Sequence, residues 1–193
     1  MLKKIAYSGV EGAFAHIAAK RLFPDELYVS FGSFKEAYEA VSSGDCDLAV
    51  LPTENSYAGK VKEVADLLEK GELHILSMHS FPIIQNLLGI RGSRPGDIKT
   101  VISHPKALEQ CDDYINAHGY KVIQAANTAV AAKEVIDRQD MSLAAIASLE
   151  TAARYGLNVL DEKINSSDDN VTTFAVVSRD KDNTTEGEQT TWE

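Results

Sequence analysis

The sequence predicts an α/β protein made of two similar βαβαβ lobes. Three observations support this prediction. Short apolar runs with the composition of strands alternate with longer segments of helical period. Small polar residues follow these runs, where the carboxyl ends of parallel strands would lie. The same order of elements then occurs a second time, and matching positions are 95 residues apart.

The first half of the chain contains three predicted strands and three predicted helices. The strands are expected at residues 4–7, 27–31 and 47–51, and the helices at residues 14–22, 34–41 and 61–69. Gly9 and Gly12 mark the turn before the first helix. Ser33 and Glu36 have the spacing of a capping box, so the second helix is expected to begin directly after Ser33.

The second half repeats this order. Its strands are expected at residues 99–102, 121–124 and 143–147, and its helices run through residues 108–115, 131–136 and 152–155. At the constant offset, Ser8 matches Ser103 and Ser33 matches Thr128. Because parallel strands need crossover helices, each half is expected to form its own parallel sheet.

Two extended segments are expected to join the lobes. Residues 73–90 cross from the first lobe to the second, and residues 171–178 return alongside them. The predicted lobes are therefore residues 1–78 together with about 172–193, and residues 79–171. The polar residues after 180 are typical of a solvated extension.

Composition excludes several classes of function. The 193 residues include 29 Asp and Glu against 19 Lys and Arg, a net charge of −10, which argues against binding to nucleic acid. No apolar run approaches the roughly 20 residues of a membrane span, and no secretion signal is present, so a cytoplasmic location is expected. Cys46 and Cys111 lack metal-ligand spacing, which indicates two reduced thiols and no metal. No phosphate-binding or dinucleotide motif indicates a cofactor.

The polar ends of the predicted strands suit a small carboxylate ligand. Several precede helices, whose first N–H groups are unpaired and whose dipole favours an anion. We expect the ends from both lobes to face one cleft. A second interpretation stays open, because Ser33 and Thr128 are ordinary helix caps and Glu54 is either an acid–base group or a capping partner. No Ser/His/Asp triad is indicated by spacing.

Six motifs in order resemble those of the prephenate dehydratase family, over about residues 4 to 178. They lie at residues 9–14 (GVEGAF), 52–59 (PTENSYAG), 103–107 (SHPKA, followed by Gln110-Cys111), 127–129 (NTA), 144–148 (AAIAS) and 170–174 (NVTTF). The resemblance implies a fold like type II periplasmic binding proteins, with both lobes forming one catalytic unit and the active site in the cleft between them. It also implies a carbon–oxygen lyase that converts prephenate to phenylpyruvate with loss of water and carbon dioxide, in phenylalanine biosynthesis, without metal or redox cofactor.

The resemblance also implies roles for single residues. Thr172 would donate a hydrogen to the departing hydroxyl, and Phe174, two residues on, would pack near the substrate ring. The other residues expected to bind the substrate are Glu54, Asn55, Ser56, Ser103, His104 and Thr128.

Two departures from the family pattern stand out. Thr173 occupies the place of the arginine in the family's Thr-Arg-Phe motif, so a bidentate cation is missing; Lys106 or Lys60 is our hypothesis for a compensating charge. Only 14 residues follow Arg179, so the C-terminal regulatory ACT domain of the family, and feedback by phenylalanine, are not expected.

Alternatives to prephenate dehydration remain open from the sequence. The first is a non-catalytic module that binds a small carboxylate, because a fold alone does not decide function. Within catalysis, arogenate dehydratase and a non-aromatising prephenate decarboxylase are the other candidates. The family is often dimeric, and a homodimer is compatible with the sequence although no feature demands one.

Overall fold

The structure is a computed structural model that describes residues 2–167 and 169–181. The chain divides into two compact units. The first comprises the chain up to Gly9, Ala15–Phe81 and the residues from Thr172 on; the second comprises Val10–Phe14 and Pro82–Val171. The predicted polar extension beyond residue 181 lies outside the described residues.

The first unit is built on a mixed sheet with the strand order β2-β1-β3-β11-β5. Its strands are β1 (Lys4–Ser8), β2 (Leu27–Phe31), β3 (Leu48–Asn55), β5 (His74–Pro82) and β11 (Val171–Ser178), and the short β4 (Gly59–Lys60) pairs with the end of β3. β1 runs parallel to β2 and β3, whereas β11 is antiparallel to β3. Apolar residues fill the central strands because both faces of this sheet are covered by helices.

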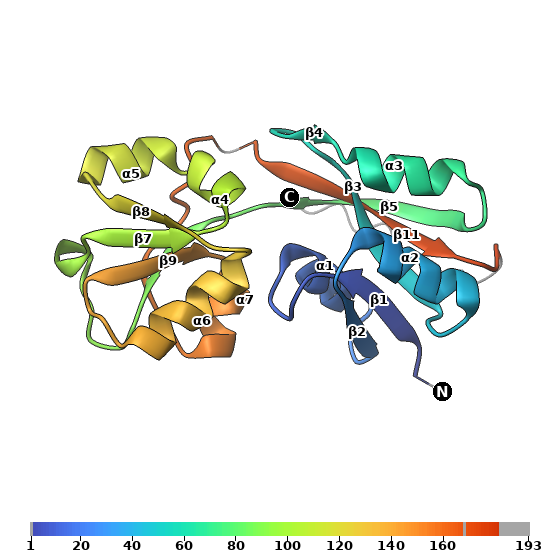
Figure 1. The fold of residues 1–193 in the computed structure, drawn as a ribbon, viewed down its shortest axis with the longest axis horizontal. Coiled ribbons are helices and arrows are strands. Elements are labelled where there is room, and N and C mark those ends of the chain that lie inside the picture. Colours follow the sequence, from blue (N-terminus) through green and yellow to red (C-terminus); the bar gives the residue numbers. More distant parts are fainter. Residues whose placement is uncertain (1, 168, 182–193) are drawn as a thin grey trace. The chain divides into compact units, whose positions relative to one another are not determined.

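Three helices cover the two faces of the first sheet (Figure 1). They are α1 (Phe14–Leu22), α2 (Phe34–Ser43) and α3 (Lys62–Glu69). Ala37 and Val41 of α2 and Val64 of α3 pack against Ala49 and Leu51 of β3 in one core cluster. On α1, His16 contacts the rings of Tyr7 and Tyr28, which places α1 on the opposite face.

The predicted cap of α2 is confirmed. Ser33 Oγ accepts a hydrogen bond from Glu36 N at 3.1 Å, and Glu36 Oε2 in turn accepts from Gly32 N at 2.8 Å, one residue before the cap. The helix ends at Gly44, whose left-handed backbone (φ 92°) is the usual helix terminator.

The second unit has the strand order β10-β6-β9-β7-β8. Its strands are β6 (Asn86–Gly89), β7 (Thr100–Ser103), β8 (Lys121–Gln124), β9 (Leu143–Ala147) and β10 (Asn158–Asp161). β7 is parallel to β8 and β9, and β6 is antiparallel to β9 and to β10.

Helices cover both faces of the second sheet as well (Figure 1). They are α4 (Pro105–Glu109), α5 (Asp112–His118), α6 (Thr128–Arg138) and α7 (Leu149–Tyr155), and a 3₁₀ turn, η1, spans Pro95–Asp97. α6 and α7 pack on the face that carries Ala145 and Ala147, while α4 and α5 pack on the face that carries Ala144 and Ile146. The alternation of these four residues along β9 follows from the period of a strand.

The two sheets share one arrangement, which confirms the prediction of two similar lobes. In each, three parallel strands are followed by an antiparallel strand, β11 next to β3 and β6 next to β9. The prediction of purely parallel sheets was therefore wrong. The antiparallel strands come from the extended segments, whose N–H and C=O groups need partners and find them at the edges of β3 and β9. The expected return of residues 171–178 beside the first crossing is confirmed, because β11 neighbours β5.

Residues 10–14 follow β1 in the chain yet pack within the second unit. The carbonyl of Gly12 accepts a hydrogen bond from Thr151 Oγ1 at 3.2 Å, and Glu11 forms an ion pair with Arg154. Gly12 has φ +95°, and a Cβ there would lie 3.5 Å from Thr151 Oγ1. That distance is an ordinary van der Waals contact, so it is the left-handed conformation that explains a glycine at this turn.

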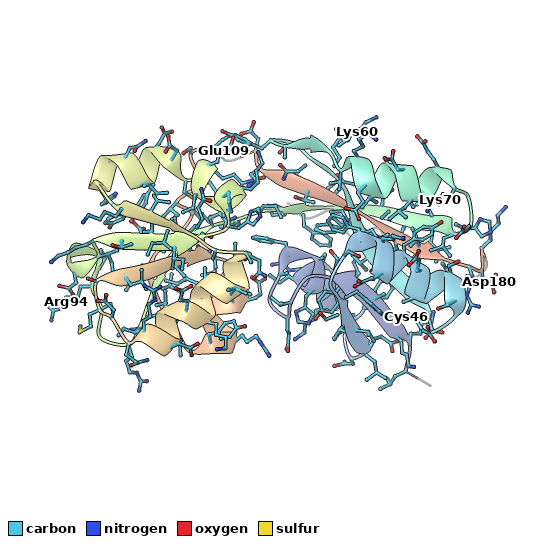
Figure 2. The ribbon with its side chains drawn as sticks, in the orientation of Figure 1. Cys46, Lys60, Lys70, Arg94, Glu109 and Asp180 are labelled. Carbon is cyan, nitrogen blue, oxygen red and sulfur yellow. The ribbon has the colours of Figure 1, made fainter. Side chains whose placement is uncertain are left out.

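Charged side chains lie on the outside of each unit. Lys60 and Lys70 project from the first unit, and Arg94 and Glu109 project from the second (Figure 2). This distribution fits an acidic chain in which, among the described residues, no Asp, Glu, Lys or Arg is buried.

A core substitution tests the packing of the first unit. Leu51 is fully buried in the cluster between β3 and the helices, so Leu51→Ala is expected to lower the free energy of unfolding by about 2–5 kcal/mol. Leu27 is 48% exposed on the edge strand β2, and Leu27→Ala is expected to cost less than about 1 kcal/mol. Urea denaturation followed by circular dichroism measures both, and equal losses would contradict this packing.

Candidate functional site

In the first unit, the predicted site residues meet where β3 ends. Asn55 is the last residue of β3, and the antiparallel register places it directly opposite Thr172 of β11. Thr172 is 8% exposed. Two residues that are 117 positions apart in the sequence are thus brought together by the pairing of two strands.

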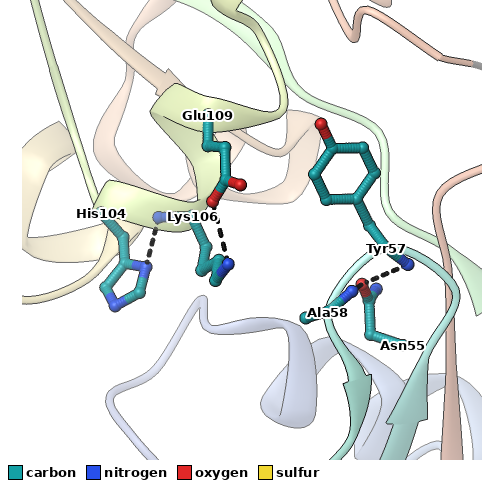
Figure 3. A network of polar contacts seen from close by, with 6 residues as sticks. All are labelled: Asn55, Tyr57, Ala58, His104, Lys106 and Glu109. Atoms are coloured by element: carbon teal, nitrogen blue, oxygen red, sulfur yellow. Dashed lines mark hydrogen bonds and ion pairs between the residues drawn. The ribbon is translucent and has the colours of Figure 1, made fainter.

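The side chains of this pair are hydrogen-bonded. Asn55 Nδ2 donates to Thr172 Oγ1 at 2.8 Å. Asn55 Oδ1 accepts from the backbone N–H groups of Tyr57 and Ala58, at 3.0 and 2.9 Å (Figure 3). The turn after β3 therefore holds the Asn55 amide, and the amide holds the Thr172 hydroxyl.

Thr173, which replaces the motif arginine, makes contacts different from those of Thr172. Its hydroxyl hydrogen-bonds Ser80 Oγ of β5 at 2.9 Å, and its carbonyl accepts from Thr53 Oγ1 at 3.1 Å. Successive side chains on a strand point to opposite faces. A residue at position 173 therefore leaves β11 on the face opposite to the Thr172 hydroxyl, which sequence reasoning did not consider.

Phe174 is a core residue in this structure. It is 2% exposed, and its ring lies edge-on to Phe81 with the centroids 6.0 Å apart; Arg21 stacks over Phe81 in turn. Almost none of its surface is open to a ligand, which differs from the expectation that it contacts the substrate ring. Its ring packs β11 against Phe81 of the neighbouring strand β5.

The remaining candidates of the first unit lie on the exposed hairpin of β3 and β4. Glu54 and Lys60 are both exposed and face each other in the register of β3 and β4. Ser56 is exposed as well. These positions are accessible to a ligand, in contrast to Phe174.

In the second unit, His104 caps α4 with its ring. Its Nδ1 accepts a hydrogen bond from Lys106 N at 3.1 Å (Figure 3). Burial, and then the charge of Lys106, lowers the pKa of His104 below its ordinary value, so the ring is neutral at neutral pH. Because Nδ1 is the acceptor, the proton of the neutral ring is on Nε2, which is therefore a hydrogen-bond donor.

Ser103 and Thr128 differ in what they offer to a ligand. Ser103 is fully buried, and its hydroxyl donates to the Ile146 carbonyl at 2.6 Å. Its hydrogen is therefore used inside the unit, whereas the sequence analysis expected it to bind the substrate. Thr128 is the first residue of α6 and 8% exposed, and within the described residues its hydroxyl has no hydrogen-bond partner. Thr128 is thus the one of the two with a free donor.

The cap of α6 is Asn127 rather than Thr128. Asn127 Oδ1 accepts from Val130 N at 2.8 Å. The constant offset of 95 had matched Thr128 to Ser33, the cap of α2. In α6 the cap lies one residue earlier than this match predicts. An Asn three residues before Val130 was the signal in the sequence that identifies it.

The two candidate compensating cations differ in their partners. Lys106 Nζ lies 2.9 Å from Glu109 Oε2, and both side chains are about half exposed (Figure 3). Lys60 forms no ion pair with any residue that the structure describes. Lys106 is thus partly neutralised by its own helix, whereas Lys60 is not.

Sequence analysis did not single out one buried polar residue, Gln85. It is 1% exposed; its Nε2 donates to Gln110 Oε1 at 3.3 Å, and its Oε1 has no partner among the described residues. The adjacent amides Gln85 and Asn86 within the otherwise apolar run 81–90 were its signal in the sequence. The contact fixes the start of β6 against Gln110, the residue that follows α4.

The described residues contain no group of three His, Cys, Asp or Glu side chains arranged to bind a metal. Cys46 and Cys111 are unpaired and buried, and burial raises the pKa of Cys111 to about 12, so neither is a reactive thiolate. Across residues 2–167 and 169–181, the helices are all too short or too polar to cross a bilayer.

Comparison with known proteins assigns the family. The sequence model of prephenate dehydratase matches residues 5–182. The chain belongs to the prephenate dehydratase family. All six motifs of the sequence analysis fall inside the matched range.

The relatives similar to the chain include proteins named prephenate dehydratase and proteins named arogenate dehydratase. Arogenate dehydratase/prephenate dehydratase 1, chloroplastic, of Arabidopsis thaliana is 39% identical over 177 residues, which are 92% of this chain and 45% of the relative. Prephenate dehydratase of Methanocaldococcus jannaschii is 36% identical over 185 residues, covering 93% of this chain and 66% of the relative. The chain thus spans about half the length of the plant relative.

Solved structures agree with the family assignment. The prephenate dehydratase of Arthrobacter aurescens, solved in complex with L-Phe, superposes with a TM-score of 0.84 at 30% identity, covering 92% of this chain and 60% of that chain. A nutrient-binding protein of Burkholderia cenocepacia shares the fold alone, with a TM-score of 0.51 at 12% identity, covering 94% of this chain and 87% of that one. The expected fold, like that of type II periplasmic binding proteins, is confirmed.

The lowered pKa of His104 predicts a pH-dependent stability. Below about pH 6.5 the unfolded chain binds a proton at His104 that the folded chain resists, so this contribution to the free energy of unfolding is present above that pH and is lost as the pH falls. His104→Asn keeps an acceptor for Lys106 N but does not titrate. The stability advantage of wild type over this variant is expected to shrink between pH 7.5 and 5.5 in urea titrations. A difference independent of pH would refute the assignment.

Proposed function

We propose that this chain catalyses the prephenate dehydratase reaction, the conversion of prephenate to phenylpyruvate with loss of water and carbon dioxide. The observation that carries the proposal is the hydrogen-bonded pair Thr172 and Asn55, which stands at two motifs of the family the chain belongs to. A hydroxyl is the group that the reaction requires near the departing oxygen.

The chemistry needs a hydrogen-bond donor, and no electron acceptor. The bond between the ring and its carboxylate carbon breaks to release carbon dioxide, and its electron pair enters the ring as the carbon–oxygen bond to the hydroxyl breaks. The departing hydroxyl takes one proton, ultimately from solvent, and leaves as water. In the proposal, the Thr172 hydroxyl donates to that oxygen, and its burial beside β3 keeps bulk water from competing for it.

Two carboxylates of prephenate also need donors. We assign this role in the second unit to His104 Nε2–H and to the free Thr128 hydroxyl at the start of α6, whose unpaired N–H groups favour an anion. Glu54 and Ser56 stay in the proposal as exposed polar residues of the hairpin of β3 and β4. Ser103 and Phe174 support the site from inside instead.

A positive charge for one carboxylate is assigned to Lys106 or Lys60. Lys106 follows His104 directly in the SHPKA motif, and its ion pair with Glu109 is on the surface, where such pairs contribute little and exchange readily. This makes the ammonium group available to a ligand carboxylate.

Arogenate, the amino counterpart of prephenate, is the second candidate substrate. The name of the Arabidopsis relative includes both activities. Incubating the chain with prephenate and with arogenate, and measuring phenylpyruvate in alkali and phenylalanine by chromatography, separates them. Binding of prephenate without product would favour a non-catalytic carboxylate-binding module, and a product without an aromatic ring would favour a non-aromatising decarboxylase.

The proposal also includes a cytoplasmic location and a homodimer. The two unpaired, buried thiols suit a reducing compartment, although the Arabidopsis relative is named chloroplastic. Size-exclusion chromatography with light scattering measures the state of association, and a monomer at micromolar concentration would remove the dimer from the proposal.

Removing the Thr172 hydroxyl is the sharpest test of the catalytic assignment. Thr172→Val keeps the shape and removes the donor, so kcat for prephenate is expected to fall by about 10²–10⁴-fold. Thr172→Ser keeps a hydroxyl and is expected to retain most activity.

The neighbouring threonine provides the matched control. Thr173→Val removes a hydroxyl from the same strand, one that bonds Ser80, and is expected to change kcat less than about threefold. Native circular dichroism in both variants excludes unfolding as the cause. If the two valine variants lost activity equally, Thr172 would not be the donor.

The charge hypothesis has its own prediction. Lys106→Ala is expected to raise KM for prephenate about 10- to 150-fold with a small change in kcat, because a carboxylate loses a charge-assisted hydrogen bond of about 1.5–3 kcal/mol. Lys133→Ala is the control, since Lys133 also forms a surface ion pair, with Asp137. Unchanged kinetics in Lys106→Ala would transfer the hypothesis to Lys60.

A further inference from the structure

The orientation of the Asn55 side chain is determined by its backbone partners. An asparagine amide presents one oxygen, which accepts hydrogen bonds, and one NH₂ group, which donates them. The N–H groups of Tyr57 and Ala58 are donors, so the atom they contact, at 3.0 and 2.9 Å, must be the oxygen (Figure 3). The NH₂ group is then the end of the amide that lies 2.8 Å from Thr172 Oγ1.

This arrangement decides which way the hydrogen bond to Thr172 runs. Because an amide NH₂ only donates, the Thr172 oxygen is the acceptor, and its own hydrogen is left for another acceptor. In the described part of the chain, Thr172 Oγ1 hydrogen-bonds no group besides Asn55. Accepting one hydrogen bond also polarises the hydroxyl and strengthens the bond it donates.

The strands hold both groups in place. Asn55 pairs with Thr172 in the ladder of β3 and β11, and with Gly59 in the hairpin of β3 and β4. Gly59 has φ +77°, a left-handed conformation that suits the tight turn between these two strands. The amide is thus fixed by backbone geometry on two sides, which is the support that a preorganised site needs.

We infer that Asn55 is a positioning residue that fixes the polarity of the Thr172 hydroxyl, so that this hydroxyl accepts from Asn55 and donates to the departing oxygen of the substrate. The inference rests on the proposed function and deepens it, since it gives Asn55 a role other than contact with the substrate. It accounts for an amide at this position, because a carboxylate of the same shape would reverse the hydrogen bond.

Asn55→Asp tests this inference directly. One carboxylate oxygen still accepts from Tyr57 and Ala58, while the other faces Thr172 and, when ionised, only accepts. The Thr172 hydrogen then points to residue 55 and not to the substrate. At pH 8, kcat is expected to fall about 10²–10³-fold.

The pH profile separates reversed polarity from simple damage. A protonated carboxyl group donates again, and above its pKa the protonated fraction grows about tenfold for each unit that the pH falls. The ratio of the variant's kcat to that of wild type is therefore expected to rise about tenfold per unit as the pH falls from 8, and to level off once it approaches one. The titratable residues on the strand of Asn55 and on the two strands paired with it are Glu54 and Lys60; they are present in both proteins, so their effect cancels in the ratio.

Two further variants complete the design. Asn55→Ala removes the donor without supplying a competing acceptor, so its kcat is expected to fall less at pH 8 than that of Asn55→Asp and to follow the wild-type pH profile. In a Thr172→Val background, Asn55→Asp is expected to cause no further loss and no rise in acid, because the hydroxyl whose polarity it reverses is gone.

Each outcome decides the inference. A constant ratio of the Asn55→Asp and wild-type kcat values between pH 8 and 5 would overturn it. If Asn55→Asp lacked a native circular dichroism spectrum, the Asn55→Ala variant would decide instead. A kcat of Asn55→Ala equal to that of wild type would then overturn the inference. Failure of wild type to convert prephenate or arogenate would refute the proposed function itself, and this role of Asn55 with it.

Discussion

The pairing of β11 with β3 is the constraint on which the rest of the first unit depends. It completes the sheet beside three parallel strands, and it gives β5 its only neighbour within the described sheet. The same ladder sets Thr172 opposite Asn55. A strand far along the sequence from β3 thus supplies stability and, on our proposal, the hydroxyl that takes part in the reaction. One irregularity adjusts it: the register shifts between Thr173 and Phe174, and the skipped residue of β3, Thr53, bonds the Thr173 carbonyl.

Both units use backbone N–H groups to orient a side chain that has two different ends. In Asn55 the oxygen is occupied by the turn after β3, and in His104 Nδ1 is occupied by the start of α4. The opposite end, Nδ2 or Nε2, then has to donate. No charged partner is needed for this effect. It suits an acidic protein that, on our proposal, binds a dianion, because the donors are dipoles whose direction is set by the fold.

Much of the fold could be predicted from the sequence, because its signals are local. Ser33 and Glu36 identify the start of α2, and the apolar runs locate the central strands. The antiparallel strands were missed as members of the sheets, since the partner of an extended segment depends on contacts far along the chain. The pairing of Thr172 with Asn55 has the same origin, with 117 residues between the two.

For the candidate site, the sequence indicates candidate residues but not how each side chain is bonded. Motif positions do not indicate whether a hydroxyl is free, as in Thr128, or already bonded inside the unit, as in Ser103. Nor do they show that Phe174 packs against Phe81. Burial and hydrogen-bond direction decide these roles, and both come from tertiary structure.

The order of the strands has a consequence for how the chain is made. β3 is synthesised early, but its second edge pairs with β11, the last strand described. That edge therefore stays unpaired while more than a hundred further residues are synthesised. The continuous segment Pro82–Val171 contains every strand of the second sheet, so this sheet can form before β11 has been synthesised. The first unit therefore starts to be synthesised before the second but completes its sheet after it. Until then, the unpaired edge of β3 is the place where the nascent chain is most exposed to aggregation.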